Sequence, residues 1–534
     1  MCQLRSPWKS GARSLRLCPE QQSGRQGRWL SPELDTEREF AAEDLSEKGR
    51  AAQTAIMNRA AASKNTSPMK ILVVLANYGT KNDSYLRRLV QEYASMSHDV
   101  HVVVLTNVAK NLGDQVEVVV KTPHGDPWSF PFAHKEILAK HLDDYDLFIY
   151  SEDDTLLTEQ NINAFLSATE VLPPDEIAGF LRMEKSSDGA VSFSTVHGYF
   201  RWDPQSVVAH GDYTFAFFTN EHAACYILTR TQLRRAIDSG GFLVEPHHEK
   251  YDLLVTAATD PYTQCGLKKV ICISNLRDFV LPHLPNRYVG QLGLGDHEFY
   301  EQVRALQEIF NKERPAVSLL NREKKAEHYR WSKSLYEPVR QDILDLIPAG
   351  AQRLLSYGCG SGDIEAELMK RGIRVTGIPL DSVIAVTAQA KGIKVVCGDS
   401  ETALEELSGE RFDCILLTNI MHLIPDPSKL LASLASLLVS GGCVVATLPN
   451  LNYISILRQR AVLHPAYRCL GNHEQSGVNL ASPRAIQKWF TRAQLKPQEF
   501  IPVVPQRFIG VFRALGGRLS SLLAEEFLIL AKKP

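Results

Sequence analysis

The spacing of hydrophobic residues predicts alternating strands and helices in the second half of the chain. Short apolar or β-branched runs at residues 374–378, 394–399, 412–418 and 442–448 are separated by segments with helical periodicity, and an earlier run starts at Leu354. Strands buried on both faces read as continuous apolar runs joined by crossover helices. The pattern therefore predicts an α/β fold with a doubly wound parallel sheet.

The strand that starts at Leu354 runs into three glycines at alternate positions, Gly358, Gly360 and Gly362. Glycine lets the backbone turn sharply, and a ligand can then lie against main-chain N–H groups. The spacing G-x-G-x-G differs from the dinucleotide-binding pattern G-x-G-x-x-G, because Asp363 stands three positions after Gly360. For the glycines alone an ordinary strand-to-helix turn is the alternative, and the strands that follow argue against it.

Together with Asp426-Pro427, the Ser440-Gly-Gly442 turn and Leu448-Pro-Asn450, the glycine loop resembles the class I S-adenosylmethionine-dependent methyltransferases. The resemblance is strongest to members associated with surface polysaccharide synthesis and runs from about residue 327 to the C-terminus. It implies S-adenosyl-L-methionine as the cofactor. The residues that it implies for cofactor binding are Gly358, Gly360, Gly362, Asp363, Asp399 and Asn419.

One position departs from the pattern of that family. In the family, the second strand ends in a carboxylate that accepts hydrogen bonds from the ribose hydroxyls of the cofactor, whereas in this chain Pro379 stands in that place. We expect Asp381, two residues further on, to substitute from a shifted loop. Without a replacement, the loss of this charge-assisted hydrogen bond would weaken cofactor binding by roughly 1.5 to 3 kcal/mol. In the tail after residue 450, where the family has its acceptor-binding cap, His473 is the candidate general base. A surface histidine without a catalytic role is the alternative.

The first half of the chain shows the same alternation from Met69 onward. A strand at residues 71–76, a helix at 85–96 and a strand at 100–106 are predicted to form a β-α-β unit. Because Met69 itself starts a buried strand and reads like a natural protein start, the segment before it is expected to be a dispensable extension or to result from a mis-assigned start.

A later buried strand, which starts near Tyr145, ends in three consecutive carboxylates, Glu152, Asp153 and Asp154. Adjacent acids repel one another, and a hard divalent ion such as Mn²⁺ or Mg²⁺ would hold them ionised together. The alternative is that Asp154 or Thr155 caps the next helix.

The acid cluster at a strand end, within an α/β domain, resembles the metal-binding motif of GT-A-fold glycosyltransferases over about residues 69–320. The resemblance implies that the ion bridges the diphosphate of a nucleotide sugar. It also implies that His283 completes the metal site, although a packed core histidine is an equal alternative. Arg182, Trp202 and Glu245 are expected to contact a sugar acceptor, with Glu245 as the catalytic candidate, and a structural role is the alternative for each.

Composition restricts the remaining classes. The 534 residues are 44% hydrophobic and 22% charged, with a net charge of −2, so a globular chain of two or three domains is expected, with no field that would attract nucleic acid. Ten cysteines lie singly with no C-x-x-C pair, which favours a reducing cytoplasm over a disulfide framework or a zinc cluster. No apolar run approaches the roughly 20 residues of a transmembrane helix.

The predicted organisation has three parts. Residues 1–68 are rich in Gln, Arg, Ser and Ala and are expected to form a disordered extension. Residues 69–320 form the GT-A-like domain, and residues 321–534 form the methyltransferase domain, so two Rossmann-like units lie in one chain. The charged segment at residues 321–326 is expected to mark their boundary.

Two functions follow from the two resemblances. The first is a bifunctional enzyme of cell-surface polysaccharide synthesis, which transfers a sugar from a nucleotide sugar to a glycan acceptor and a methyl group from S-adenosyl-L-methionine. The second is a glycosyltransferase whose methyltransferase-like part has become an inactive scaffold, an alternative that Pro379 favours. We expect peripheral association with a membrane-bound glycan assembly complex rather than a spanning segment.

Overall fold

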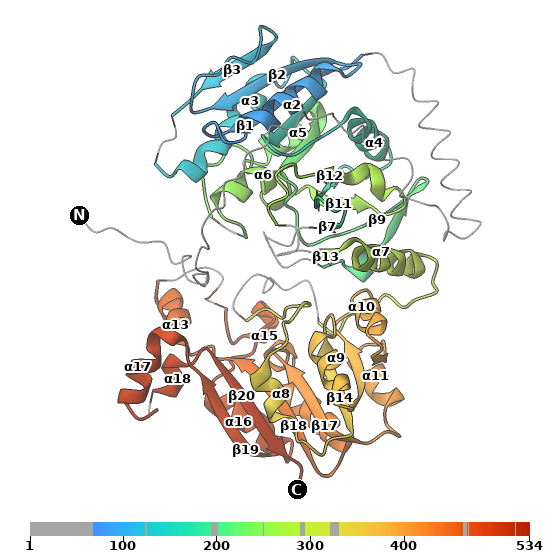
Figure 1. Cartoon of the computed structure of the whole chain (residues 1–534), viewed down its shortest axis with the longest axis vertical. Helices are drawn as coiled ribbons and strands as arrows, with labels where there is room; N and C mark the ends of the chain where they lie inside the picture. The colour runs from blue at the N-terminus through green and yellow to red at the C-terminus, as the bar shows by residue number, and fades with distance from the viewer. Residues whose placement is uncertain are drawn as a thin grey trace, which may run out of the picture. The chain divides into compact units, whose positions relative to one another are not determined.

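A computed structural model of the protein describes residues 68–122, 125–193, 201–248, 250–288, 294–320, 331–462, 467, 469–517 and 519–534 (Figure 1). The predicted extension lies outside these residues except for Pro68, and so does the charged segment 321–326. In the part of the chain that is described, no helix is both long and apolar enough to cross a membrane.

The N-terminal part is built on a five-stranded sheet with the order β10-β4-β1-β2-β3. Its strands are β1 (Lys70–Asn77), β2 (Asp99–Thr106), β3 (Val116–Val120), β4 (Leu147–Glu152) and β10 (Cys225–Thr229). The first four are parallel, and β10 is antiparallel to β4. Because β2 lies on one side of β1 and β4 on the other, the winding reverses between β1 and β4. Ligands of open α/β sheets bind at such a switch point, outside the carboxyl ends of the strands.

The predicted β-α-β unit is confirmed. In β1 every residue after Lys70 is buried, as expected for a central parallel strand. Helix α2 (Asp83–Ala94) turns Leu86, Leu89 and Tyr93 inward, which are spaced three and four residues apart and therefore share one helix face.

Two smaller sheets complete the N-terminal part, with the orders β5-β11-β9-β8 and β12-β6-β7-β13. Their strands are β5 (Glu176–Ala178), β6 (Leu181–Lys185), β7 (Val191–Phe193), β8 (Val208–His210), β9 (Tyr213–Ala216), β11 (Lys268–Cys272), β12 (Val280–Pro282) and β13 (Leu294–Gly295). The remaining longer helices are α3 (His134–Lys140), α4 (Glu159–Thr169), α5 (Arg230–Asp238), α6 (Leu253–Thr263) and α7 (Asp296–Phe310).

The C-terminal part contains a seven-stranded sheet with the order β16-β15-β14-β17-β18-β20-β19. Its strands are β14 (Arg353–Cys359), β15 (Arg374–Pro379), β16 (Lys394–Val395), β17 (Phe412–Thr418), β18 (Leu438–Pro449), β19 (Lys496–Val503) and β20 (Glu526–Lys532). The five predicted strands are present and parallel, which confirms the doubly wound sheet. The structure adds β20, which is antiparallel to both β18 and β19.

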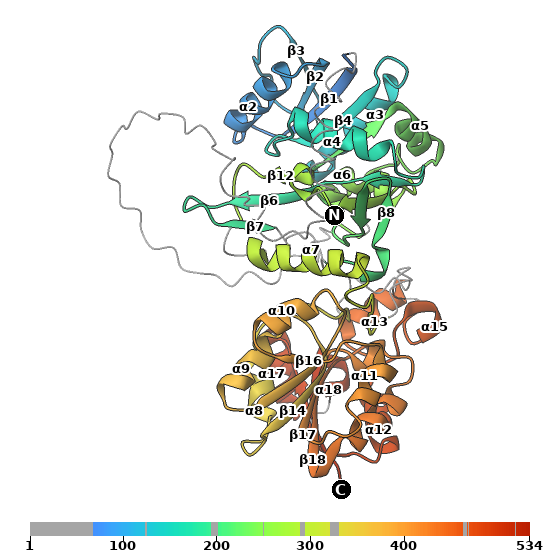
Figure 2. The ribbon, with the colours of Figure 1, turned by 90° about the vertical axis from the view of Figure 1, so that its right-hand side faces the viewer.

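Helices cover both faces of this sheet. Figure 2 shows α8 (Gln341–Leu346), α9 (Asp363–Lys370) and α10 (Ala385–Ala390) on one face, and α11 (Ser400–Glu406) and α12 (Pro427–Ser436) on the other. Helix α16 (Pro483–Arg492) packs beside α12.

The sequence of residues 329–346 predicts a helix, and this is wrong between residues 331 and 340, where the chain is not helical. Pro338 lacks an N–H group and disfavours helical dihedrals at Glu337, so a helix cannot pass through this point without loss. Only α8 forms, after the proline.

Candidate functional site

The glycine loop joins β14 to α9 at the carboxyl edge of the seven-stranded sheet. Gly358 and Gly362 have φ angles of +77° and +82°, which side chains disfavour. A Cβ atom at Gly358 would lie 2.1 Å from Cδ1 of Ile420, in the loop after β17. The positive φ angles and the close packing therefore explain why this loop needs glycine, as predicted.

Gly360 has a different reason to be glycine. Its Cβ position would lie 1.9 Å from the carbonyl oxygen of Leu335, and the N–H group of Ser361 donates to that same oxygen at 2.6 Å. We call residues 331–337, which reach the glycine loop here, the strap. The strap occupies the space beside Gly360, so the close neighbour of this glycine is the chain itself.

Lys333 fixes the middle of the strap. Its Nζ donates to the carbonyl oxygen of Thr418 at 2.8 Å, to the Thr418 hydroxyl at 2.7 Å and to Glu337 at 2.5 Å. The Lys333 side chain is only 1% exposed, so this charge is neutralised inside the protein rather than by water. The strap thus spans from the end of β17 to the glycine loop. No local pattern in the sequence predicts this position.

His422 lies in the loop after β17 and holds the start of the strap. Its Nε2–H group donates to the carbonyl oxygen of Trp331 at 2.5 Å, which leaves Nδ1 as a bare acceptor. Burial lowers the pKa of His422 to about 4, so the ring is neutral at physiological pH. Nδ1 is buried and has no hydrogen-bond partner among the described residues.

Three of the predicted cofactor carboxylates have partners within the chain. Asp363 accepts from Lys391 Nζ at 2.7 Å and from the Ser361 hydroxyl at 2.6 Å. Asp399 is exposed and caps α11 through the Thr402 N–H group, whose hydrogen bonds lower the pKa of Asp399. The third, Asp381, is 3% exposed.

Asp381 does not present an open carboxylate edge beside Pro379. Its Oδ1 atom accepts from the N–H groups of both Val383 and Ile384 at 2.9 Å. This is the bonding of a helix-start cap, ahead of α10. Its expected contact with a ribose stays a prediction, and the structure gives Asp381 a local structural task as well.

The other predicted residues of this part lie close to the same edge. Asn419 follows β17 with a φ angle of +46°, and its N–H group donates to the carbonyl oxygen of Thr447 at 3.0 Å. His473 begins the short helix α15 (His473–Ser476), and its Nε2–H group donates to the carbonyl oxygen of Leu423 at 3.1 Å. His473 is therefore tied to the same loop as His422, while its role as a general base stays a prediction.

The residues fit S-adenosyl-L-methionine in part. The glycine loop and the buried, unpartnered Nδ1 atom of His422 offer a cradle and an acceptor for a donor group of the cofactor. The ribose contact is the poor fit, because Pro379 has no side-chain acceptor and Asp381 already caps a helix. The glycine loop is the feature of this arrangement that supports cofactor binding.

The acid cluster forms a second candidate site, at the switch point between β1 and β4. Asn77, at the end of β1, donates to Asp153 at 2.6 Å, and Asn82 donates to Asp153 at 2.7 Å and to Asp154 at 3.2 Å. Asp153 and Asp154 are each 6% exposed. The amides thus hold the two buried carboxylates side by side.

The predicted histidine joins this cluster. Leu284, just after β12, donates its N–H group to the carbonyl oxygen of Asp154 at 2.9 Å, which brings His283 beside the cluster. His283 Nε2 lies 3.5 Å from Asp154 Oδ2, and its Nδ1 lies 2.5 Å from Glu184 Oε1. A carboxylate that orients the far nitrogen of a histidine is the usual outer partner of a metal-binding histidine.

Burial sets the ionisation of the cluster. Burial, together with the charge of Asp154, raises the pKa of Glu152 to about 8 and that of Asp153 to about 6. One oxygen of Glu152 and one of Asp154 are buried without a hydrogen-bond partner among the described residues. The site therefore contains more buried carboxylate oxygens than its own hydrogen-bond donors satisfy.

The alternative that these acids cap the next helix is not what the structure has. Helix α4 begins at Glu159, and Thr158 is its cap, in a capping box with Asn161. As placed here, no three His, Cys, Asp or Glu side chains within the described ranges could hold a metal ion together. Metal binding by Glu152, Asp153, Asp154 and His283 stays a prediction that requires side-chain movement.

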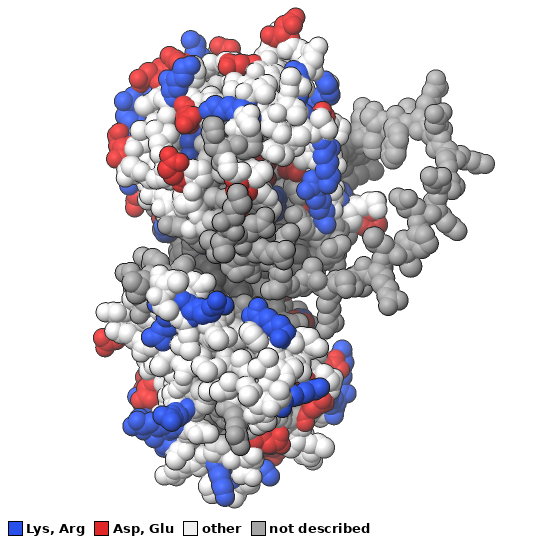
Figure 3. Space-filling model, turned by 90° about the vertical axis from the view of Figure 1, so that its left-hand side faces the viewer, with Lys and Arg blue, Asp and Glu red and all other residues white. Residues whose placement is uncertain are grey.

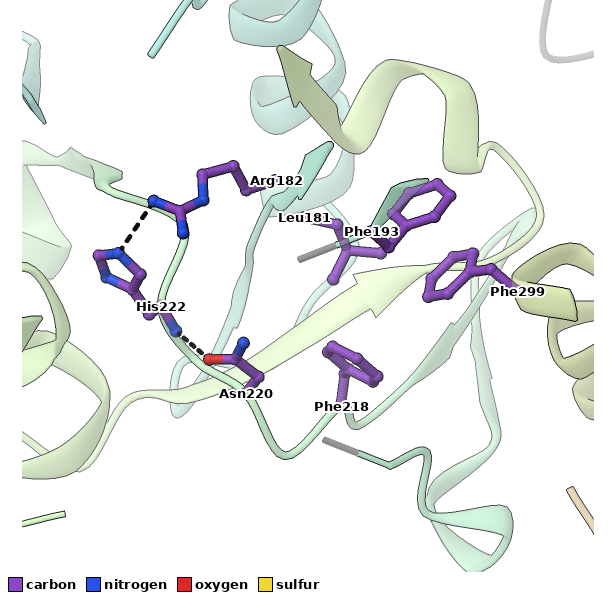
Figure 4. Close-up of a pocket in the computed structure, with 7 residues that line it drawn as sticks. All are labelled: Leu181, Arg182, Phe193, Phe218, Asn220, His222 and Phe299. Atoms are coloured by element: carbon purple, nitrogen blue, oxygen red, sulfur yellow. Dashed lines mark hydrogen bonds between the residues drawn. The ribbon is translucent and has the colours of Figure 1, made fainter. Parts of the chain in front are cut away.

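A small pocket lies beside β6 (Figure 4). Its lining residues are Leu181, Arg182, Phe193, Phe218, Asn220, His222 and Phe299. Arg182 is 8% exposed, its Nη1 lies 3.4 Å from His222 Nε2, and its Nε has no partner in the described part of the chain. The guanidinium also favours ionisation of Glu152. Glu245, by contrast, is exposed in the segment between α5 and α6, and its catalytic role stays a prediction.

Residues 339–463 match the family model of methionine biosynthesis protein MetW. Ubiquinone biosynthesis O-methyltransferase of Dechloromonas aromatica (strain RCB) is 27% identical over 175 residues, which cover 31% of this chain and 73% of that protein. The protein of the same description from Xanthomonas axonopodis pv. citri (strain 306) is 28% identical over 206 residues, which cover 37% of this chain and 83% of that protein.

Two solved structures also resemble the chain. A SAM-dependent methyltransferase from Methanosarcina mazei is 17% identical, with a TM-score of 0.28, and covers 37% of this chain and 99% of that one. An N-methyltransferase from Bradyrhizobium japonicum WM9, in complex with S-adenosyl-L-homocysteine, is 15% identical, with a TM-score of 0.26, and covers 36% and 87%. The sequence matches and the sheet order support a class I S-adenosylmethionine-dependent methyltransferase in the C-terminal part of the chain.

Proposed function

We propose that the protein is a bifunctional, glycan-modifying transferase. Its C-terminal part methylates a hydroxyl group of a sugar or of a sugar substituent, and its N-terminal part transfers a sugar from a nucleotide sugar to a glycan acceptor. The single observation that carries the second activity is the buried acid cluster at the switch point between β1 and β4. The glycine loop and the sequence relatives support the first.

The methyl transfer needs few groups from the protein. S-adenosyl-L-methionine would supply an electrophilic methyl group on a sulfonium centre. The glycine loop would bind the cofactor, and the neutral ring of His422 would add no positive charge to this edge of the sheet. The O-methyltransferase names of the relatives support a hydroxyl oxygen as the acceptor, and His473 is the candidate that would take its proton.

The sugar transfer is supported by the electrostatics of the acid cluster. Glu152, Asp153 and Asp154 would hold a divalent ion, which would supply charge neutralisation for a diphosphate leaving group. Glu184 would keep the imidazole of His283 in one orientation. The strand order β3-β2-β1-β4, with the antiparallel β10 beside it, supports a nucleotide-binding unit.

Calorimetric titration of the full chain with S-adenosyl-L-methionine and with its demethylated product tests the first activity. We expect binding by both. If neither binds at about 1 mM, which corresponds to a free energy weaker than about −4 kcal/mol, the C-terminal part is a scaffold and only the glycosyltransferase proposal remains.

Hydrolysis of a panel of nucleotide sugars, with and without Mn²⁺, tests the second activity. We expect at least one donor to be hydrolysed only with the ion, and Asp154→Asn to abolish that turnover. Asp188→Asn is the matched control, because Asp188 is an exposed acid of the same domain. Equal turnover by Asp154→Asn and wild type would reduce the cluster to a structural role.

A further inference from the structure

Three helices of the C-terminal part lie together at one end of its sheet (Figure 1). They are α13 (Ile454–Ala461), α17 (Gln506–Ala514) and α18 (Ser520–Leu523). Arg507 of α17 donates to the Tyr453 hydroxyl at 2.5 Å, and the Tyr453 and Phe508 rings meet edge to face with centroids 6.4 Å apart. These contacts place the start of α13 against α17.

Helix α17 carries its apolar residues on one face, yet it buries none of its residues. Phe508 and Phe512 are partly covered, whereas Val511 is 50% exposed. Leu515, four residues after Val511 and thus above it on the same face, is 41% exposed. Leu519 is 39% exposed.

The surface continues onto the neighbouring helix. Val462, just after α13, is 72% exposed, and Ile454, at its start, is 36% exposed. These residues are five of the twelve large hydrophobic side chains that are most exposed in the described chain. Scattered exposed hydrophobic residues are normal, but a cluster on adjacent helices marks an interaction surface. We call Ile454, Val462, Val511, Leu515 and Leu519 the apolar patch.

The charges around the apolar patch are mostly positive. Residues 451–473 and 500–524 contain no Asp or Glu, although the whole chain has 61 acidic and 59 basic residues. Arg458, Arg507 and Arg513 are exposed beside the patch. Figure 3 looks onto this side of the molecule, where the lower half shows uncharged surface with Lys and Arg side chains, and some Asp and Glu side chains, around it. The nearest acids in sequence, Glu474, Glu499 and Glu525, lie just outside the two segments.

We propose that α13, α17 and α18 form a docking surface for an anionic lipid bilayer. Short helices with exposed aliphatic side chains and flanking arginines lie in the plane of a membrane interface, where the apolar atoms enter the acyl boundary and the cations meet lipid phosphates. The excess of basic over acidic residues around the apolar patch complements anionic headgroups. The surface depends on neither proposed transfer reaction.

Co-flotation of the full chain with vesicles tests this surface. The vesicles contain phosphatidylcholine alone or about 30% phosphatidylglycerol. We expect binding to the anionic vesicles, several-fold weaker in about 0.5 M salt than in about 0.05 M salt, because the charges act through screened attraction. The double variant Val511→Asp with Leu515→Asp should weaken the apparent affinity for vesicles at least about tenfold.

Val120→Asp is the matched control, because Val120 is 52% exposed on β3, in the other part of the chain. It should bind vesicles like wild type, and near-native melting of all variants excludes unfolding as the cause. The proposal is overturned if wild type stays unbound with anionic vesicles, or if the double variant binds them equally well. It is also overturned if the patch proves to join two copies of the chain, seen as a concentration-dependent dimer that the double variant abolishes.

Discussion

Replacing Glu152 by Gln should stabilise the unliganded protein at alkaline pH and leave it unchanged at acid pH. Glu152 is partly buried, with one carboxylate oxygen shielded from solvent, and its pKa is about 8 instead of 4.5, because burial and the charge of Asp154 disfavour the carboxylate. Between these two values the folded state holds a proton that the unfolded state has lost. The stability of the wild type must therefore fall as the pH rises from about 4.5 to about 8.

The size of the effect follows from the two pKa values. The rise of the pKa from 4.5 to about 8 lowers the unfolding free energy of the wild type by about 5 kcal/mol above pH 8 and by about 3 kcal/mol at pH 7. Glutamine resembles the protonated side chain in shape and charge, so Glu152→Gln removes this loss. The variant should exceed the wild type by about 3 to 5 kcal/mol at pH 8.5 and by less than about 1 kcal/mol at pH 4.5.

Thermal and urea unfolding from pH 4.5 to 9 measures the difference. Glu136→Gln is the control, because the Glu136 side chain is 72% exposed, and it should change stability by less than about 0.5 kcal/mol at any pH. Adding Mn²⁺ should stabilise wild type more at pH 8 than at pH 5, and the variant less. The reasoning is refuted if the variant and wild type unfold alike at every pH, or if their difference does not grow with pH.

Gly360→Ala should lower the unfolding free energy by about 1 to 3 kcal/mol in the absence of any ligand, because the new Cβ atom would meet the carbonyl group of Leu335. Gly409→Ala is the control and should cause no such loss, because the space at the Gly409 Cβ position is open. Denaturant titration compares the pair, and equal stabilities would show that the strap moves freely. Asp381→Ala should cost about 1 kcal/mol of stability through loss of its cap, and Asp381→Asn should retain most of it. If Asp381→Asn keeps stability yet loses cofactor affinity in calorimetry, the carboxylate binds ribose, and unchanged affinity leaves only the cap. Asp154→Asn should remove Mn²⁺-dependent stabilisation in a melting assay, because a metal ligand is lost, and a retained shift would place the ion elsewhere.

The sheets were predictable where a strand is buried on both faces. Strands β14, β15, β17 and most of β18 are largely buried apolar runs, whereas β16 has two residues and neither is buried. The order in which the runs appear was enough to predict a doubly wound sheet. Strand β19 escaped prediction because it is an edge strand with no buried residue, so its sequence carries little hydrophobic pattern.

The site was predictable only where neighbours in sequence are neighbours in space. The three acids of the cluster are consecutive, so their repulsion was visible in the sequence. The bond between Lys333 and Thr418 joins residues 85 positions apart, and no local signal announces it. The strap could therefore not be inferred, although Pro338 argued against the helix that was predicted in its place.

The placement of β20 between β18 and β19 bears on how the C-terminal part assembles during synthesis. Strand β19 leaves the ribosome before β20, yet it pairs only with β20 in this sheet. Residues 496–503 must therefore wait, with unpaired backbone groups, until residues 526–532 are available. The β14-to-β18 unit meets no such delay, because each strand after β14 pairs with one made before it. During this interval the unpaired residues 496–503 could pair with a strand of another nascent chain, so this is when a chaperone would be most useful.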